Sequence, residues 1–209
     1  MFGPGRPINP AEGYEFGSLR RVKVPWPLVG IDYRREPKGF HFGFQVSTDG
    51  LASGSRDDEA ILHGLCELIE RDATALLAFM SAQELATRVH EIDDGDGPEV
   101  MATRAAIEAV GCKLSVIDMT SDVGVPAFTA IVSDPVGADL RVTKYAHSGG
   151  SGCHPHRRRA LEKAIVEAAQ SRITRITGSR DDLPASTYAA AEAAEDRQAV
   201  AGMLSFAQV

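Results

Sequence analysis

The chain has 209 residues, 44% hydrophobic and 24% charged, which is typical of one soluble globular domain. Its formal net charge is −7, with no basic surplus, which argues against nonspecific binding of nucleic acid. No apolar run approaches the roughly 18 residues that span a bilayer, and the N-terminus lacks the basic start and apolar core of a signal peptide.

The cysteines Cys66, Cys112 and Cys153 are widely spaced and odd in number. This pattern fits reduced thiols in a cytoplasmic protein better than a disulfide framework or a zinc site. Residues 1–18 are rich in glycine and proline without periodicity, so we expect an irregular arm. Residues 20–29 combine β-branched residues with prolines and predict a short or edge strand, and residues 40–46 alternate as a second strand does.

A turn-rich loop over residues 47–56 leads into a helix predicted over residues 57–79. Six apolar residues recur at helical spacing in it: Ile61, Leu62, Leu65, Leu68, Ile69 and Leu76. Three acids lie outside this stripe, within roughly 80° of one another around the helix axis: Glu59, Glu67 and Glu70. A divalent cation that bridges to phosphates would relieve their repulsion, and Arg71 beside them suits a phosphate. The alternative is a solvated acidic face.

Gly64 lies inside that helix and weakens it by roughly 1 kcal/mol relative to alanine. It therefore indicates close approach of another backbone or of a ligand. Further on, residues 93–98 contain several acids, but their positions do not match the EF-hand pattern, so a solvated turn is expected. A helix is predicted over residues 99–110, followed by strands at 113–119, 127–133 and 141–146.

The glycine-rich residues 149–152 are expected to form a loop before a helix at residues 157–176. Such a loop could cradle an anion, although it lacks the Gly-Lys-Ser/Thr of a Walker motif. Arg157, Arg158 and Arg159 at the helix start form either a surface cluster or a site for an anion or a partner. Glu167 and Gln170 share one side of the helix. Strands and helices alternate without regular βαβ units, which predicts an α+β fold with a mixed or antiparallel sheet.

Two segments resemble the signatures of the YcaO family. The first matches at Gly50-Leu51-Ala52, Ser53-Gly54, Glu59-Ala60, His63-Gly64-Leu65, Glu67 and Glu70-Arg71-Asp72. The second matches at His154-Pro155, Ala160-Leu161 and Glu167-Ala168-Ala169-Gln170-Ser171-Arg172. The order and separation of the two segments also fit the family.

The resemblance implies a protein that binds ATP and Mg²⁺ and phosphorylates the oxygen of a peptide backbone amide after a nucleophile has added. The products in this family are azolines, thioamides or amidines in ribosomally made peptides (RiPP biosynthesis), by cyclodehydratase or thioamidation chemistry. Position by position, it implies that Glu59, Glu67 and Glu70 bind magnesium and nucleotide and that Arg71 contacts phosphate. Ser55, at a position where the family has asparagine, and Glu167 and Gln170 are the other implied nucleotide-site residues.

The resemblance also implies a peptide substrate and a TfuA-type or peptide-delivering partner. It covers nearly all of residues 19–185, which correspond to the middle of a full domain. The earlier family helix of the form S-A-L-x-E-x-x-E-R has no counterpart before Ser47, and residues 186–209 form an alanine-rich segment that predicts a terminal helix. We therefore expect an oligomer, with activity completed by another chain or a second copy.

Two alternatives remain open at this point. One is a catalytically silent YcaO fragment that binds a peptide or a partner protein. The other is an acidic α+β binding domain unrelated to the family.

Overall fold

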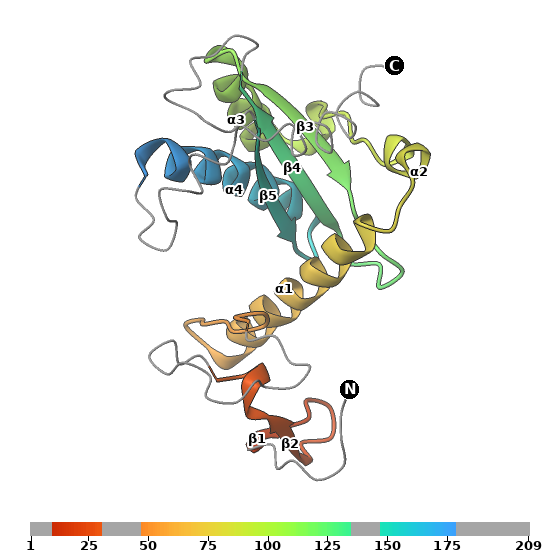
Figure 1. Cartoon of the computed structure of the whole chain (residues 1–209), viewed down its shortest axis with the longest axis vertical. Coiled ribbons are helices and arrows are strands. Elements are labelled where there is room, and N and C mark those ends of the chain that lie inside the picture. The colour runs from red at the N-terminus through yellow and green to blue at the C-terminus, as the bar shows by residue number, and fades with distance from the viewer. Residues whose placement is uncertain (1–9, 31–46, 135–146, 179–209) are drawn as a thin grey trace. The chain divides into compact units, whose positions relative to one another are not determined.

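The computed structural model describes residues 10–30, 47–134 and 147–178, which belong to two compact units, Met1–Gly64 and Leu65–Val209 (Figure 1). Both units contain antiparallel strands, and helices pack on the sheet of the larger one, so the predicted α+β class is confirmed. Among the described helices, none has the length and apolar character needed to cross a membrane.

The smaller unit contains the hairpin of β1 (Pro10–Tyr14) and β2 (Arg21–Pro25), followed by the short 3-10 helix η1 (Trp26–Leu28). Strand β2 occupies the segment where the sequence predicted a strand. Strand β1 lies in the arm where we expected no regular structure. The burial of its side chains alternates along the strand, but its glycine and proline give no such alternation in the sequence. The strand predicted at residues 40–46 lies outside the described residues.

The larger unit is built on a three-stranded antiparallel sheet. Its strands are β3 (Lys113–Asp118), β4 (Ala127–Ser133) and β5 (His147–Cys153), in that order. The first two match the predicted strands. The third corrects the expectation of an anion-binding loop, because residues 149–152 pair with β4 from Ile131 to Phe128. The strand predicted at residues 141–146 falls outside the described residues.

In the described part of the chain, four α-helices accompany the strands. They are α1 (Asp57–Leu77), α2 (Ala82–Thr87), α3 (Pro98–Ala109) and α4 (Arg157–Thr177), and a 3-10 turn η2 (Asp94–Asp96) precedes α3. Helix α2 begins with a capping box between Ser81 and Glu84, and α4 ends at Gly178 in the left-handed conformation that favours glycine. The helix predicted from the alanine-rich C-terminal segment lies outside the described residues.

Helices α3 and α4 cover one face of the sheet (Figure 1). Phe128, Ala130 and Val132 of β4 point to that face, since alternate residues of a strand share a side. They pack on the apolar residues of α4, which include Leu161 and Ile165. A second cluster uses the other face, where Cys66 and Ala73 of α1 meet Met119, Ala127 and Cys153.

Helix α4 lies directly on the backbone of β5, and this contact depends on two glycines. A Cβ atom at Gly150 would overlap the backbone nitrogen of Ala168 and lie 2.6 Å from the carbonyl oxygen of Ala164. A Cβ at Gly152 would overlap the carbonyl oxygen of Ala160. Backbone atoms cannot move aside as a flexible side chain can, so both positions require glycine. The glycine-rich sequence here sets the packing of a helix on a sheet.

We predict that Gly150→Ala destabilises the chain by about 3 kcal/mol, because the helix must lift off the strand. Gly149→Ala is the matched control, since its Cβ would meet only the carbonyl oxygen of Ala130 at 3.9 Å. It should change stability by less than about 1 kcal/mol. Urea unfolding of the two variants and the parent measures both effects, and equal losses at the two glycines would contradict the packing described here.

Candidate functional site

The buried side of α1 in the larger unit carries an acid. Cys66, Glu70 and Ala73 are 4%, 6% and 1% exposed, whereas Leu65 and Leu68 of the apolar stripe keep 45% and 48% of their surface exposed. The sequence pattern alone would place the leucines inside and the acids outside. A fully solvated acidic face is therefore wrong for Glu70.

Charged side chains from two helices surround Glu70. Burial raises its pKa above the usual value for a glutamate, and the charges of Glu167 and Glu67 act in the same direction. Lys163 and Arg71 act in the opposite direction and do not outweigh the burial. A carboxylate in this state gains free energy from an additional cation nearby, because the cation offsets both the burial and the neighbouring negative charges.

Arg71 lies between the two acids of its own helix. Its Nη1 is 4.0 Å from Oε1 of Glu70, and its Nη2 is 3.7 Å from Oε1 of Glu67. These distances exceed the hydrogen-bond range, so the two ion pairs are long. The guanidinium itself remains about half exposed. It therefore places positive charge beside the carboxylates where a bound anion can reach it.

Helix α4 contributes a lysine and an acid at the edge of β5. Lys163 Nζ donates to the carbonyl oxygen of Cys153 at 3.3 Å, and Glu167 Oε2 accepts from the backbone nitrogen of Ser151 at 3.1 Å. Gln170, one turn after Glu167, is exposed. Sequence reasoning missed Lys163 as a site residue, although its position four residues before Glu167 places both on one side of the helix.

The other predicted site residues, Ser55 and Glu59, belong to the smaller unit. Glu59 Oε2 accepts hydrogen bonds from the backbone nitrogen and the hydroxyl of Ser55, at 2.8 and 2.5 Å. These two bonds hold the pKa of Glu59 below its usual value. The Ser55–Glu59 pair thus stabilises the turn that leads into α1. Glu59 is an ionised hydrogen-bond acceptor near neutral pH.

The presence of glycine at position 64 is explained by a backbone contact within the smaller unit. A Cβ at this position would lie 2.7 Å from the carbonyl oxygen of Gly50, in the turn that precedes α1. The mid-helix glycine thus permits close approach of another segment of backbone, which is one of the two explanations that the sequence allowed.

Two carboxylates, Glu67 and Glu70, are candidates to hold a metal ion in the larger unit. Mg²⁺ in nucleotide sites is usually bound by one or two carboxylates together with phosphate oxygens and water, so this donor set fits. Within residues 10–30, 47–134 and 147–178, no group of three or more His, Cys, Asp or Glu side chains is arranged to hold a metal ion.

The neighbouring thiols are unsuited to nucleophilic chemistry. Cys66 and Cys153 are both free and buried, and they pack in the cluster beside Glu70. Burial, together with Cys66 and Glu70, raises the pKa of the Cys153 thiol to about 12. The thiolate is the reactive form of cysteine, so Cys153 is inert at neutral pH.

Arg172, at the end of the second signature segment, has a structural role. Its Nη2 lies 2.7 Å from Oδ1 of Asp134, a carboxylate that is almost fully buried just after β4. Arg175, one turn later, donates to the carbonyl oxygen of His147 at 2.6 Å. Together these contacts fix the second half of α4 to the two strands that it covers.

Comparison with known proteins identifies the class. Residues 1–207 match the model of the YcaO family, which is described as a cyclodehydratase family that binds ATP and Mg²⁺. The chain therefore belongs to the YcaO family, and ATP and Mg²⁺ are the cofactors of that family.

Curated relatives share clear sequence identity with the chain. One is an uncharacterized protein in the tfuA 3′ region of Rhizobium leguminosarum bv. trifolii, 46% identical over 186 residues, which are 88% of this chain and 43% of the relative. Another, from Methanothermobacter thermautotrophicus, is 34% identical over 161 residues, 77% of this chain and 40% of the relative. The chain thus spans about two fifths of the length of these relatives.

Solved structures share the fold. A heterocyclase in complex with substrate and cofactor superposes with a TM-score of 0.67 at 24% identity, covering 90% of this chain and 24% of the other. YcaO from Methanopyrus kandleri bound with AMPPCP and Mg²⁺ gives 0.63 at 21% identity, covering 87% of this chain and 45% of the other. The E. coli microcin synthetase McbBCD complex gives 0.62 at 21% identity, covering 84% of this chain and 44% of the other.

We predict that Glu70→Gln stabilises the folded chain at pH 7.5 by on the order of 1 kcal/mol. Because the pKa of Glu70 is raised on folding, the native state binds more protons than the unfolded state. Stability from this group is therefore present at low pH and is lost as pH rises through the folded pKa. The advantage of the variant should shrink as the pH is lowered toward 4.

Thermal unfolding between pH 4 and 8 measures this dependence. Glu67→Gln is the control, because its side chain is more exposed, at 22%, and it should stabilise the chain less. A Glu70→Gln variant that is less stable than the parent at pH 7.5 would mean that the carboxylate is already fully compensated.

Proposed function

We propose that this chain supplies the ATP- and Mg²⁺-binding part of an enzyme that activates peptide backbone amides. The observation that carries the proposal is the buried carboxylate of Glu70, on which the charges of Arg71 in α1 and of Lys163 and Glu167 in α4 act. Membership of the YcaO family supports it. Phosphoryl transfer requires chiefly positioning and charge compensation from a protein, and this set of charges suits both tasks.

Each residue has a proposed task. Glu67 and Glu70 of the larger unit hold Mg²⁺, Arg71 and Lys163 compensate the phosphate charge, and Glu167 and Gln170 orient the nucleotide. For Glu59 and Ser55 of the smaller unit, the proposed tasks of a Mg²⁺ ligand and a nucleotide contact rest on the family resemblance alone. When bound, ATP would supply the phosphoryl group for the amide oxygen after a nucleophile has added to the carbonyl carbon. That oxygen would leave as phosphate, with ADP as the other product, to give an azoline, a thioamide or an amidine.

The second candidate is a YcaO chain that binds a peptide or a partner without catalysis. One observation favours it: in the part of the chain that the structure describes, the acids do not form a cluster of three or more metal ligands.

Calorimetric titration with ATP in the presence of Mg²⁺ separates the two candidates. For the enzyme, we predict millimolar or tighter binding that requires Mg²⁺ and is lost in Lys163→Ala and in Glu70→Gln, because each removes a group that neutralises phosphate or metal charge. Bound nucleotide at 100 times Kd should also stabilise the fold by about 2.7 kcal/mol.

Glu108→Gln is the matched control, because it removes one exposed carboxylate from α3, where it pairs only with Arg104 in the contacts described. It should bind as the parent does. If no heat of binding is measured at millimolar nucleotide, the ATP-dependent enzyme is excluded and the noncatalytic YcaO chain is supported.

We also propose self-association through the exposed leucine stripe of α1. The side chains of Leu65, Leu68 and Leu76 lie on one side of this helix and are 45%, 48% and 40% exposed. Exposed apolar patches of this kind mark interaction sites. A TfuA-type protein is a further proposed partner, supported by the relative in the tfuA 3′ region.

Light scattering tests this association. We predict that the parent chain is larger than a monomer and that Leu68→Lys shifts it toward the monomer by at least tenfold in dissociation constant, about 1.4 kcal/mol. The control Val166→Lys changes an apolar residue of similar exposure, 49%, on α4 and should leave the association unchanged. A parent chain that is monomeric at high concentration would exclude the proposed interface.

A further inference from the structure

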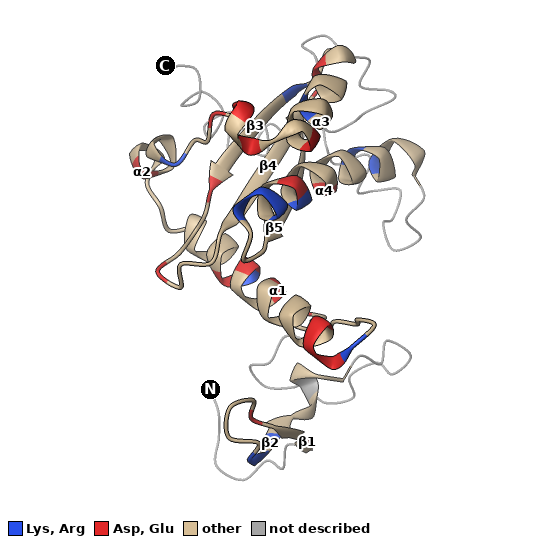
Figure 2. Cartoon of the chain, turned by 180° about the vertical axis from the view of Figure 1, so that it is seen from behind, with Lys and Arg blue, Asp and Glu red and all other residues tan. Residues whose placement is uncertain are grey.

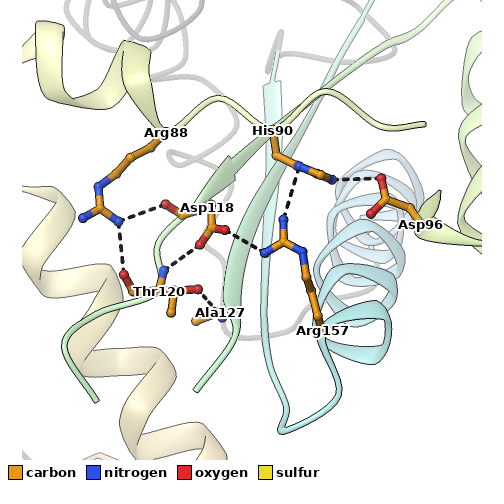
Figure 3. A network of polar contacts seen from close by, with 7 residues as sticks. All are labelled: Arg88, His90, Asp96, Asp118, Thr120, Ala127 and Arg157. Atoms are coloured by element: carbon orange, nitrogen blue, oxygen red, sulfur yellow. Dashed lines mark hydrogen bonds and ion pairs between the residues drawn. The ribbon is translucent and has the colours of Figure 1, made fainter. Parts of the chain in front are cut away.

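A polar network joins the start of α4 to the segment that follows α2 (Figure 3). This segment runs along the outer edge of β3, where the backbone nitrogen of His90 donates to the carbonyl oxygen of Val116 at 2.9 Å. The nitrogen of Asp118 in turn donates to the carbonyl oxygen of Arg88 at 2.8 Å. The backbone of His90 is therefore held in place independently of its side chain.

Both ring nitrogens of His90 have partners. Nε2 lies 2.9 Å from Oδ2 of Asp96, and Nδ1 lies 3.3 Å from Nη2 of Arg157 (Figure 3). A guanidinium only donates hydrogen bonds, so Nδ1 must accept and carries no proton. The single proton of the ring is then on Nε2, which donates to Asp96. Both contacts can be hydrogen bonds at the same time only with the proton on Nε2 and none on Nδ1.

Arg157 is the first residue of α4, and its guanidinium has two further contacts. Its Nη1 donates to Oδ2 of Asp118 at 2.8 Å, and its Cζ lies 4.5 Å from the centre of the Phe128 ring. The residue before it, His156, makes no side-chain capping bond. Three arginines at a helix N-terminus also oppose the helix dipole (Figure 2). Packing holds Ala160 and Leu161 of α4 in the core, and this network adds the polar contacts of Arg157 at the helix start.

We propose that His90 is a proton-operated latch on the first turn of α4. With Nδ1 unprotonated, the ring connects Asp96 to Arg157 and holds the helix start against the segment of residues 88–96. When Nδ1 takes up a proton, it can no longer accept from Arg157, and two positive groups face each other. Arg157 then keeps Asp118 and the Phe128 ring, and the first residue of α4 loses its contact with His90.

The charged groups around His90 determine the direction of this response. Asp96 places a carboxylate at Nε2 of the ring, and Arg157 places a guanidinium at Nδ1. Burial acts to raise the pKa of Asp118, but hydrogen bonds from Arg157 and Thr120 lower it overall, so this carboxylate stays ionised. Arg88 is engaged with the carbonyl oxygens of Asp118 and Thr120.

Two other imidazoles, His154 and His156, lie on the turn before α4 and need a control. Burial lowers the pKa of His154, as do His156 and the nearby Arg159 and Lys163. His154 Nδ1 accepts from the backbone nitrogen of His156 at 2.9 Å. Imidazole is the side chain that changes charge between pH 5 and 8, so each histidine must be tested separately.

Amide hydrogen exchange at Ala160 tests the latch, because its nitrogen donates to His156 in the first turn of α4 at 3.1 Å. After correction for intrinsic exchange, we expect the protection factor of this amide to fall roughly five- to tenfold between pH 8 and 5.5. A change of this size corresponds to the net contribution of one hydrogen bond. In His90→Gln the protection should not change over this range, whereas in His156→Gln the fall should persist.

Three outcomes would overturn the latch: constant protection in the parent, a persisting fall in His90→Gln, or a fall that His156→Gln abolishes. If His90→Gln does not fold, nitrogen NMR of the parent ring decides instead. At pH 8 the latch requires the proton on Nε2, and a proton found on Nδ1 would contradict it.

Discussion

The larger unit depends on the direct contact between the backbone of α4 and the backbone of β5. Gly150 and Gly152 leave room for this contact, because any Cβ there would meet the main chain of the helix. Dispersion and burial then hold the rest of α4 on the sheet through small and medium side chains such as Ala164 and Ile165. The ion pair of Arg172 with buried Asp134 and the contacts of Arg157 fix the two ends.

This placement of α4 creates the electrostatics of the candidate site. Lys163 and Glu167 leave the helix beside the edge of β5 and reach Cys153 and Ser151. On the other face, α1 buries Glu70 next to Cys66. Burial raises the pKa of this carboxylate, and the charges of Lys163 and Arg71 offset the burial only in part. The packing of α4 and α1 on the sheet thus determines where the charged groups of the candidate site lie.

The sequence predicted α1 and α4 to within two residues at each end, and β3 and β4 to within one, because their periodicity is strong. It was wrong about residues 149–152, since glycine signals both a loop and a close backbone contact and only the packed helix separates the two. It also could not show which side of α1 is buried, because leucine spacing marks an apolar face without showing whether this chain covers it. Lys163 was missed because a single lysine on a helix has no distinctive pattern.

The three cysteines have a practical consequence. Cys66, Cys112 and Cys153 all lie inside the protein, and burial raises the thiol pKa of Cys112 as well as that of Cys153. The native fold therefore offers almost no reactive sulfur to the solvent. One cysteine introduced on the surface will carry a fluorophore or spin label at a single known position, without first replacing any natural residue.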